Sequence, residues 1–148
     1  MNLDFVEMLS ELSATGAEFL VVGAHALAAH GYPRATGDLD IWVRADATNG
    51  ARVIESLRRF GAPLFDLTVE DLTNPGTVFQ IGTAPARIDI LTGVSGISFE
   101  EAWPRRTTIE IGPLLVGVIG REDMIRNKRA TGRPQDLVDA DRLERDRE

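Results

Sequence analysis

The chain has 148 residues and no cysteine, which excludes disulfides, thiolate zinc sites and cysteine nucleophiles. Its net charge is −7, so the protein as a whole does not attract nucleic-acid phosphates, and two histidines, His25 and His30, are too few for a three-histidine zinc site. No apolar run approaches the ~20 residues that a membrane-spanning helix needs, and the acidic first residues are unlike a signal peptide. We therefore expect one cytoplasmic domain over residues 1–148, without a membrane partner.

Hydrophobic periodicity predicts an alternation of helices and strands in the first 60 residues. The third helix has Thr48 as its expected N-cap and Gly61 as its stop. In chain order we expect a helix, a strand, a helix, a strand and a helix over residues 2–14, 18–22, 23–30, 38–44 and 49–60.

The second part of the chain predicts mainly strands, followed by two closing helices. Residues 64–75 read as irregular, with one helical turn near residues 69–72. The fold class that follows is α/β (α+β), with helices packed against a single mixed sheet, early strands parallel and later strands antiparallel. We expect strands at 77–81, 86–91, 106–111 and 114–119, and helices at 99–103, 121–130 and 134–145.

Three aspartates carry the strongest chemical signal. Residues two apart on a strand share a face, so Asp38 and Asp40 point the same way. Asp89 lies in another apolar strand, between Ile88 and Ile90. If the two strands are neighbours, three carboxylates converge, and their repulsion calls for a divalent cation such as Mg²⁺ or Mn²⁺. Two such ions can clamp the attacking and leaving oxygens of a phosphoryl transfer.

A structural interpretation stays open for several of these residues. Asp38 could simply cap a turn beside Gly37. The charge of Asp89 could be compensated by Arg87 rather than by a metal. Trp42 shares the aspartate face of its strand and either stacks near the site or packs under a helix.

Basic and small residues are candidates for phosphate binding. Gly23 and Ala24 follow a strand and open a helix, where backbone N–H groups can meet phosphate, although such a glycine often only makes a tight turn. His25 could touch a phosphate or a nucleobase, or serve packing alone. Lys128 and Arg133 could bind a triphosphate, or belong to a solvated helix face.

The spacing of these motifs resembles the DNA polymerase β-like nucleotidyltransferase superfamily. That family joins a small-residue pair to an Asp-apolar-Asp/Glu motif, nine to thirteen residues further on, and to a later acid between apolar residues. This chain supplies the three parts as Gly23-Ala24, Asp38-Leu39-Asp40 and Ile88-Asp89-Ile90.

Two further stretches resemble small bacterial members of the superfamily, including toxin-type nucleotidyltransferases related to AbiEii. Arg34 and Thr36 stand in an Arg-x-Thr-x-Asp-x-Asp segment. Lys128, Arg133 and Asp136 stand in a Lys-x-x-x-Gly-Arg-x-x-Asp segment. The resemblance implies that Arg34, Thr36, Lys128 and Arg133 contact the nucleotide.

The resemblance also implies a reaction, the transfer of a nucleoside monophosphate from an NTP to an acceptor. Asp38 and Asp40 would hold two metal ions, Asp89 would complete one site and deprotonate the acceptor, and Gly23 and Ala24 would cradle the phosphates. The acceptor stays open between an RNA such as tRNA, a protein side chain and a small molecule.

The alternative is a catalytically inactive member of the superfamily that binds a nucleotide or a partner protein, such as one component of a toxin–antitoxin pair. Ala24 replaces the second Gly or Ser of the family pattern and favours this alternative, whereas the three aspartates favour the enzyme.

Overall fold

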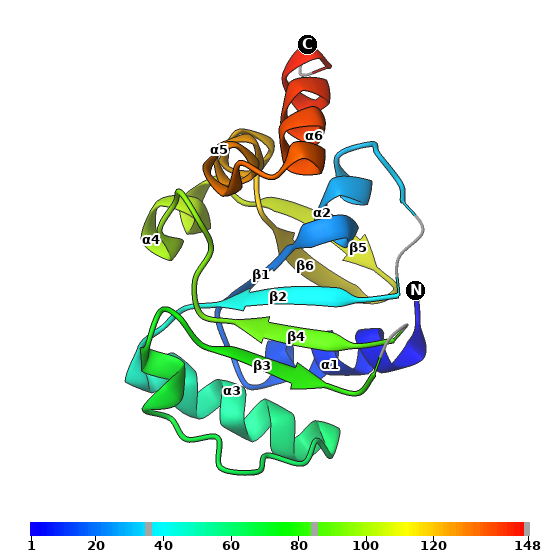
Figure 1. Ribbon diagram of the computed structural model, residues 1–148. Coiled ribbons are helices and arrows are strands. Elements are labelled where there is room, and N and C mark those ends of the chain that lie inside the picture. The colour runs from blue at the N-terminus through cyan, green and yellow to red at the C-terminus, as the bar shows by residue number, and fades with distance from the viewer. Residues whose placement is uncertain (35–36, 84–85, 147–148) are drawn as a thin grey trace.

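The computed structural model describes residues 1–34, 37–83 and 86–146 (Figure 1). The short turns η1 (Asp71–Thr73) and η2 (Trp103–Arg105) are 3₁₀ helices. The α-helices are α1 (Leu3–Ala14), α2 (Gly23–Ala29), α3 (Ala47–Phe60), α4 (Phe99–Ala102), α5 (Arg121–Thr131) and α6 (Pro134–Arg145). The strands are β1 (Phe19–Val22), β2 (Leu39–Val43), β3 (Val78–Ile81), β4 (Ile88–Leu91), β5 (Thr107–Ile111) and β6 (Leu114–Val118).

The six strands form one mixed sheet in the order β3-β4-β2-β1-β6-β5. The predicted fold class, a mixed sheet with helices packed on it, is confirmed. The pairs β2–β4 and β1–β6 are parallel, and β3–β4 and β5–β6 are antiparallel. The first two strands differ from the expected parallel arrangement, because β1 and β2 pair antiparallel. The described part of the connection between them includes the seven-residue α2, and β2 runs alongside β1 in the opposite direction.

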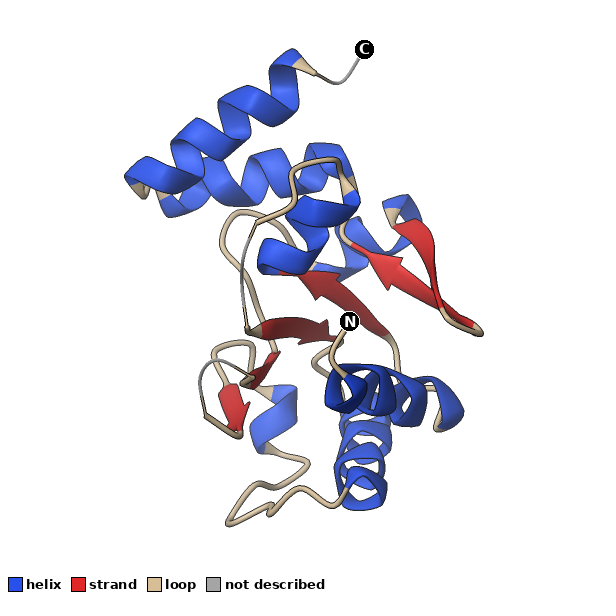
Figure 2. Ribbon diagram, turned by 90° about the vertical axis from the view of Figure 1, so that its right-hand side faces the viewer, coloured by secondary structure: helices blue, strands red, loops and turns tan. Residues whose placement is uncertain are grey.

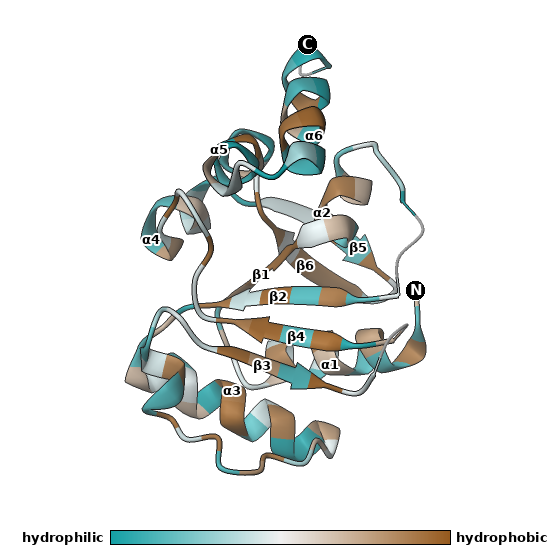
Figure 3. Cartoon of the chain, viewed as in Figure 1, coloured by the Kyte–Doolittle hydropathy of each residue, from teal (hydrophilic) through white to brown (hydrophobic). Residues whose placement is uncertain are grey.

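The helices are divided between the two sides of the sheet (Figures 1 and 2). Helices α1 and α3 contact each other behind the strands as Figure 1 shows them, while α2 and the α5–α6 pair lie on the opposite, upper side. Alternation along β2 sends the fully buried Leu39, Ile41 and Val43 to one face and leaves Asp40 and Trp42 on the other. In Figure 3, hydrophilic segments interrupt the hydrophobic strands β2 and β4 beside each other.

Helix α3 begins earlier than its sequence pattern predicts. Its N-cap is Asp46 rather than Thr48, because the Asp46 carboxylate accepts a hydrogen bond of 2.7 Å from the backbone N–H of Asn49. Gly61 ends the helix in the left-handed conformation, as expected, with φ of 88°. Among the described residues, no helix is both long and apolar enough to cross a membrane.

Candidate active site

The predicted aspartates meet at neighbouring strands of the sheet. In the parallel β2–β4 ladder Asp40 pairs with Asp89, and Asp38 directly precedes β2. In-register partners direct their side chains to the same face, so the carboxylates of Asp40 and Asp89 adjoin. On the far side of Asp89, its antiparallel partner in β3 is the exposed Gln80. The acids therefore form part of a polar row across three strands.

Burial and the neighbouring carboxylates disfavour the ionised form of Asp40. Burial is the main influence that raises the pKa of Asp40 to about 6, and the neighbouring carboxylates of Asp89 and Asp38 raise it further. A hydrogen bond with Asp89 acts in the same direction, and the charge of Arg87 acts against them. Asp40 therefore favours its protonated form or the approach of a cation.

Arg87 supplies positive charge to this cluster within the chain itself. Its Nη2 lies 3.2 Å from Oδ2 of Asp38, and its Nε lies 3.0 Å from Oδ1 of Asp89. The second contact is an ion pair without hydrogen-bond geometry, since neither Nε nor that Oδ1 has a hydrogen-bond partner within the part of the chain that the structure describes. The compensation of Asp89 by Arg87, which the sequence left open, is thus present in the structure.

A divalent cation fits the chemistry of these groups, because hard ions such as Mg²⁺ prefer carboxylate oxygens and relieve the repulsion that raises the pKa of Asp40. The geometry is less complete. Within the described residues, no three acidic or histidine side chains are already arranged to hold a metal ion. The metal site at Asp38, Asp40 and Asp89 therefore stays a prediction.

Gly23, the first residue of the Gly23-Ala24 motif, lies against the carboxylate of Asp40. Its φ is +70°, and a Cβ atom built on it would lie only 2.2 Å from Oδ2 of Asp40. The sheet explains this contact, since Val22 pairs with Asp40 immediately before the chain turns into α2. Only glycine allows this close approach of backbone and carboxylate. Ala24 follows in the first turn of α2 and is half-buried.

His25 lies close to the same loop. Burial is the main cause that lowers its pKa, while a hydrogen bond to the Asp38 backbone acts in the opposite direction. Its ring meets the ring of Phe5 edge to face at 5.6 Å, and its Nε2 is buried with no hydrogen-bond partner in residues 1–34, 37–83 and 86–146. The packing interpretation of His25 therefore has direct support, and its contact with a nucleotide stays a prediction.

The basic residues predicted near the phosphates belong to an ion cluster between α5, α6 and the loop before β2. Lys128 Nζ lies 3.2 Å from one oxygen each of Asp136 and Asp139. Arg34 binds both oxygens of Asp139, at 2.7 and 3.1 Å, and Arg133 binds Asp136 at 2.8 Å. We call these five residues the closing cluster.

The closing cluster is largely buried at its centre. Lys128 is 8% exposed and Asp139 only 2%, so Lys128 does not belong to a solvated face. Burial would raise the pKa of Asp139, but hydrogen bonds from Arg34, Gln135 and Lys128 outweigh it and hold the pKa at about 2. Phosphate binding by Arg34, Lys128 and Arg133 stays a prediction, and Thr36 lies outside the described residues.

Sequence reasoning missed Asp139 as a structural centre of this region. The available signal was its helical phase, because Asp139 lies four positions before the fully buried Leu143 and next to the fully buried Ala140. An acid on the buried face of a helix requires a cationic partner.

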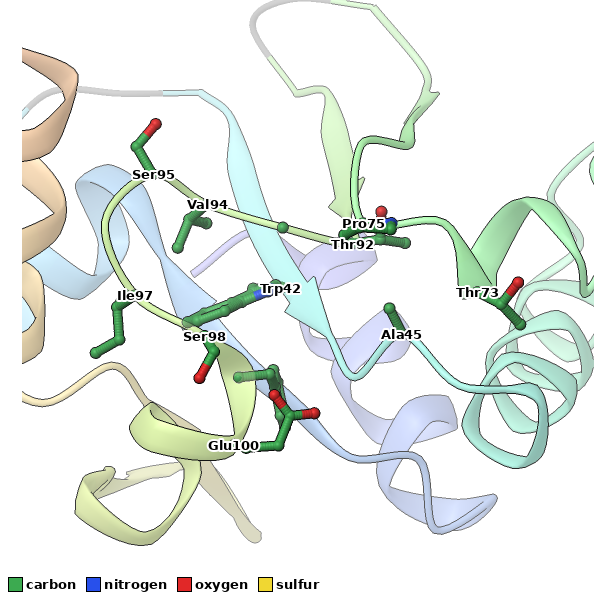
Figure 4. A pocket seen from close by; sticks show the side chains of 12 residues that line it. Trp42, Ala45, Thr73, Pro75, Thr92, Val94, Ser95, Ile97, Ser98 and Glu100 are labelled. Atoms are coloured by element: carbon green, nitrogen blue, oxygen red, sulfur yellow. The ribbon is translucent and has the colours of Figure 1, made fainter.

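A cleft of about 640 Å³ opens where β2 and β4 end (Figure 4). Trp42, which is 1% exposed, lines it and meets the ring of Phe99 in α4 edge to face at 5.2 Å. Trp42 thus packs under a helix, one of the two interpretations that its sequence position allowed. Its indole N–H is buried without a hydrogen-bond partner among the described residues.

Comparison with known proteins bears on the fold. No protein-family model matches the chain, and no curated protein sequence does. The crystal structure of a "putative nucleotidyltransferase" from Thermotoga maritima matches it with a TM-score of 0.58 and 13% sequence identity, covering 95% of this chain and 88% of that one. At this identity the match concerns architecture alone, and it shows that the chain has a nucleotidyltransferase-like fold.

Proposed function

We propose that this protein is a metal-dependent nucleotidyltransferase, which transfers a nucleoside monophosphate from an NTP to an acceptor and releases pyrophosphate. One observation carries the proposal. Asp40 and Asp89 adjoin in register on parallel strands, and the Gly23 backbone presses against the Asp40 carboxylate. The nucleotidyltransferase-like fold supports the same conclusion.

In this proposal the acids have distinct tasks. Asp38 and Asp40 would hold two divalent cations, and Asp89 would complete one of the two sites. Bound cations would supply charge neutralisation at the attacking and leaving oxygens. Asp89 also accepts the proton of the acceptor hydroxyl, and the backbone at Gly23 and Ala24 faces the phosphates. Positioning and charge neutralisation carry most of the catalysis in such reactions.

Arg87 has a part in the same proposal. Its guanidinium pairs with Asp38 and with Asp89 and offsets part of their negative charge. With a divalent cation bound at these acids, Arg87 would be available for phosphate, which its planar fork binds well.

The experiment is to compare Asp89→Asn with the wild type, using labelled NTPs and candidate acceptors. Asparagine keeps the size of the side chain and loses its charge, so we expect transfer to be abolished while NTP binding changes little. Asp66→Asn, in an exposed loop, is the matched control. Full transferase activity in Asp89→Asn would refute the role of Asp89.

A second candidate is a catalytically inactive member that binds a nucleotide or a partner protein, such as a toxin–antitoxin component. The observation that favours it is Arg87, which already pairs with two of the three acids. Wild-type protein that binds NTP with Mg²⁺ but transfers nothing to any RNA, protein or small-molecule acceptor would support this candidate.

A further inference from the structure

We propose that the cleft at the ends of β2 and β4 binds the nucleoside half of the NTP. This inference rests on the proposed function and adds a substrate subsite to it. The cleft volume, about 640 Å³, lies within the usual range of small-molecule sites. The cleft also lies outside the carboxyl ends of two neighbouring parallel strands, where open α/β sheets commonly bind ligands.

The distribution of charge separates the two ends of this face. At the acid end, Arg87 supplies a cation beside Asp38 and Asp89. None of the described residues that line the cleft is Lys, Arg or His. Its one ionic side chain is Glu100, which is 71% exposed and pairs with Arg44 at 3.4 Å. Such a cleft disfavours phosphate and suits an uncharged group, whereas phosphate at the acid end would depend on cations bound to the three aspartates.

The strand register places the cleft at a suitable distance from the acids. Trp42 follows Asp40 by two residues on the same face of β2, which is about 7 Å along the strand. Leu91 pairs with Trp42 as Asp89 pairs with Asp40. A nucleotide whose α-phosphate lies at the acid pair can therefore extend its ribose and base along the strands toward the cleft.

The indole of Trp42 offers a specific contact. Figure 4 shows it among the lining side chains, with its nitrogen between Ser98 and Thr92 in this view. This buried N–H has no hydrogen-bond partner among the described residues, and leaving a buried donor in that state is unfavourable. Ribose oxygens and nucleobase nitrogens are acceptors that could satisfy it.

The walls of the cleft are held in place by the fold. The Thr92 hydroxyl accepts a hydrogen bond of 2.8 Å from the Thr77 N–H and donates one to the Asn74 carbonyl. Gly93 lies so close to the Pro75 carbonyl that a Cβ atom would approach its oxygen to 2.1 Å. A site that is already formed loses little free energy to ordering when a ligand binds.

The test blocks the cleft with a large side chain and measures the binding of the nucleoside half and of the phosphate half separately. Ala45 lines the cleft, and Ala45→Phe would fill part of it (Figure 4). Ala51→Phe, on the exposed side of α3, is the matched control. The probes are ATP, GTP, CTP, UTP, adenosine and inorganic tripolyphosphate, each titrated calorimetrically with Mg²⁺.

We expect Ala45→Phe to weaken the tightest NTP by about tenfold or more while tripolyphosphate binding stays within about twofold. Ala51→Phe should leave both unchanged. Ser95→Phe, at the exposed mouth of the cleft, is the second blocking variant and serves if Ala45→Phe does not fold. In a Trp103→Phe background, Trp42 is the one remaining tryptophan, and adenosine or the preferred nucleoside should change its fluorescence.

Other outcomes separate this inference from the proposed function. If the blocked variants bind NTP as tightly as the wild type, the nucleoside assignment is wrong and the proposed function survives. If they bind NTP normally but lose transfer, the cleft belongs to the acceptor, which also overturns the assignment. If wild-type protein binds neither NTP nor tripolyphosphate, both proposals fall.

Discussion

At the scale of one residue, the ionised carboxylate of Asp40 lowers the stability of the folded protein. The folded protein holds its pKa at about 6, above the ordinary value of 3.8, so the folded state binds that proton more tightly than the unfolded state does. For a carboxyl shifted in this direction, the free energy of unfolding falls as pH rises from about 3.8 to about 6 and changes little above that.

Asp40→Asn should therefore stabilise the protein in a pH-dependent way. We expect its melting temperature to exceed that of the wild type at pH 7.5, and the difference to shrink toward pH 4, where Asp40 is protonated. Thermal unfolding from pH 4 to pH 8 measures this, with Asp66→Asn as the exposed control. A difference that does not grow with pH would contradict the crowding of carboxylates at Asp40.

Gly23 supports a second prediction, with a control that the chain itself provides. Gly23 and Gly16 both have positive φ, of 70° and 76°. A Cβ atom added at Gly23 would clash with the Asp40 side chain, whereas a Cβ atom added at Gly16 would have no neighbour within 4 Å in the described part of the chain. Both glycine-to-alanine variants pay the backbone strain, on the order of 1–2 kcal/mol. Gly23→Ala should lose more stability than Gly16→Ala, and it should also weaken binding of Mg²⁺ with ATP. Equal losses in denaturant unfolding would show that the contact with Asp40 is unimportant.

The sequence revealed the acids but not their whole surroundings. Period-two alternation predicts that Asp38 and Asp40 share one face, and the isolated charge of Asp89 among isoleucines marked it as unusual. The partnership of β2 with β4 depends on the strand order of the whole sheet, which no local pattern encodes. The contacts of Arg87 with two acids follow from that order and from a side-chain rotamer.

At the scale of elements, local patterns predicted most helices and strands and failed where long-range pairing decides. The antiparallel β1–β2 pair was missed because the connection between them has a helix, which usually accompanies parallel pairing. The cap of α3 was missed because Asp46 and Thr48 are both good capping residues, and their difference lies in backbone geometry.

The α5–α6 pair leads to a prediction about the closing cluster. Asp139 accepts hydrogen bonds from Arg34, Lys128 and Gln135, so Asp139→Asn leaves the buried Lys128 with Asp136 as its remaining anion. Breaking a buried ion pair in this way costs on the order of 3 kcal/mol. We expect a loss of that size at pH 7, measured by denaturant unfolding.

The pH dependence of Asp139→Asn has the opposite sign to that of Asp40→Asn. The pKa of Asp139 is lowered to about 2, so its stabilising effect is complete above the ordinary value of 3.8 and is lost as pH falls toward 2. The difference between variant and wild type should therefore shrink below about pH 4. Asp141→Asn, on the exposed side of α6, is the control and should cost little. A large loss in Asp141→Asn would mean that α6 tolerates no charge change.

At the scale of the whole molecule, the closing cluster connects the loop before β2 with the last helix, α6. Arg34 lies four residues before Asp38, and its partner Asp139 lies in the last helix. The α5–α6 pair is thus attached to the loop that leads to Asp38, the first acid of the candidate site. Sequence patterns identified both segments but not their contact, because the two partners are 105 residues apart.

The overall charge of −7 leads to the last prediction, which concerns an RNA acceptor. Non-specific RNA binding depends on cations that displace the counterions of the phosphates. Here Lys128, Arg34 and Arg133 are already paired with acids, and Arg87 is paired as well. We therefore expect no binding of a random-sequence single-stranded RNA at ~10 µM protein and ~0.15 M salt, measured by fluorescence anisotropy. A poly-glutamate of similar length is the control for unspecific signal. Tight, salt-sensitive binding of the random RNA would show that the paired cations are available to phosphate, and it would make RNA the first acceptor to test.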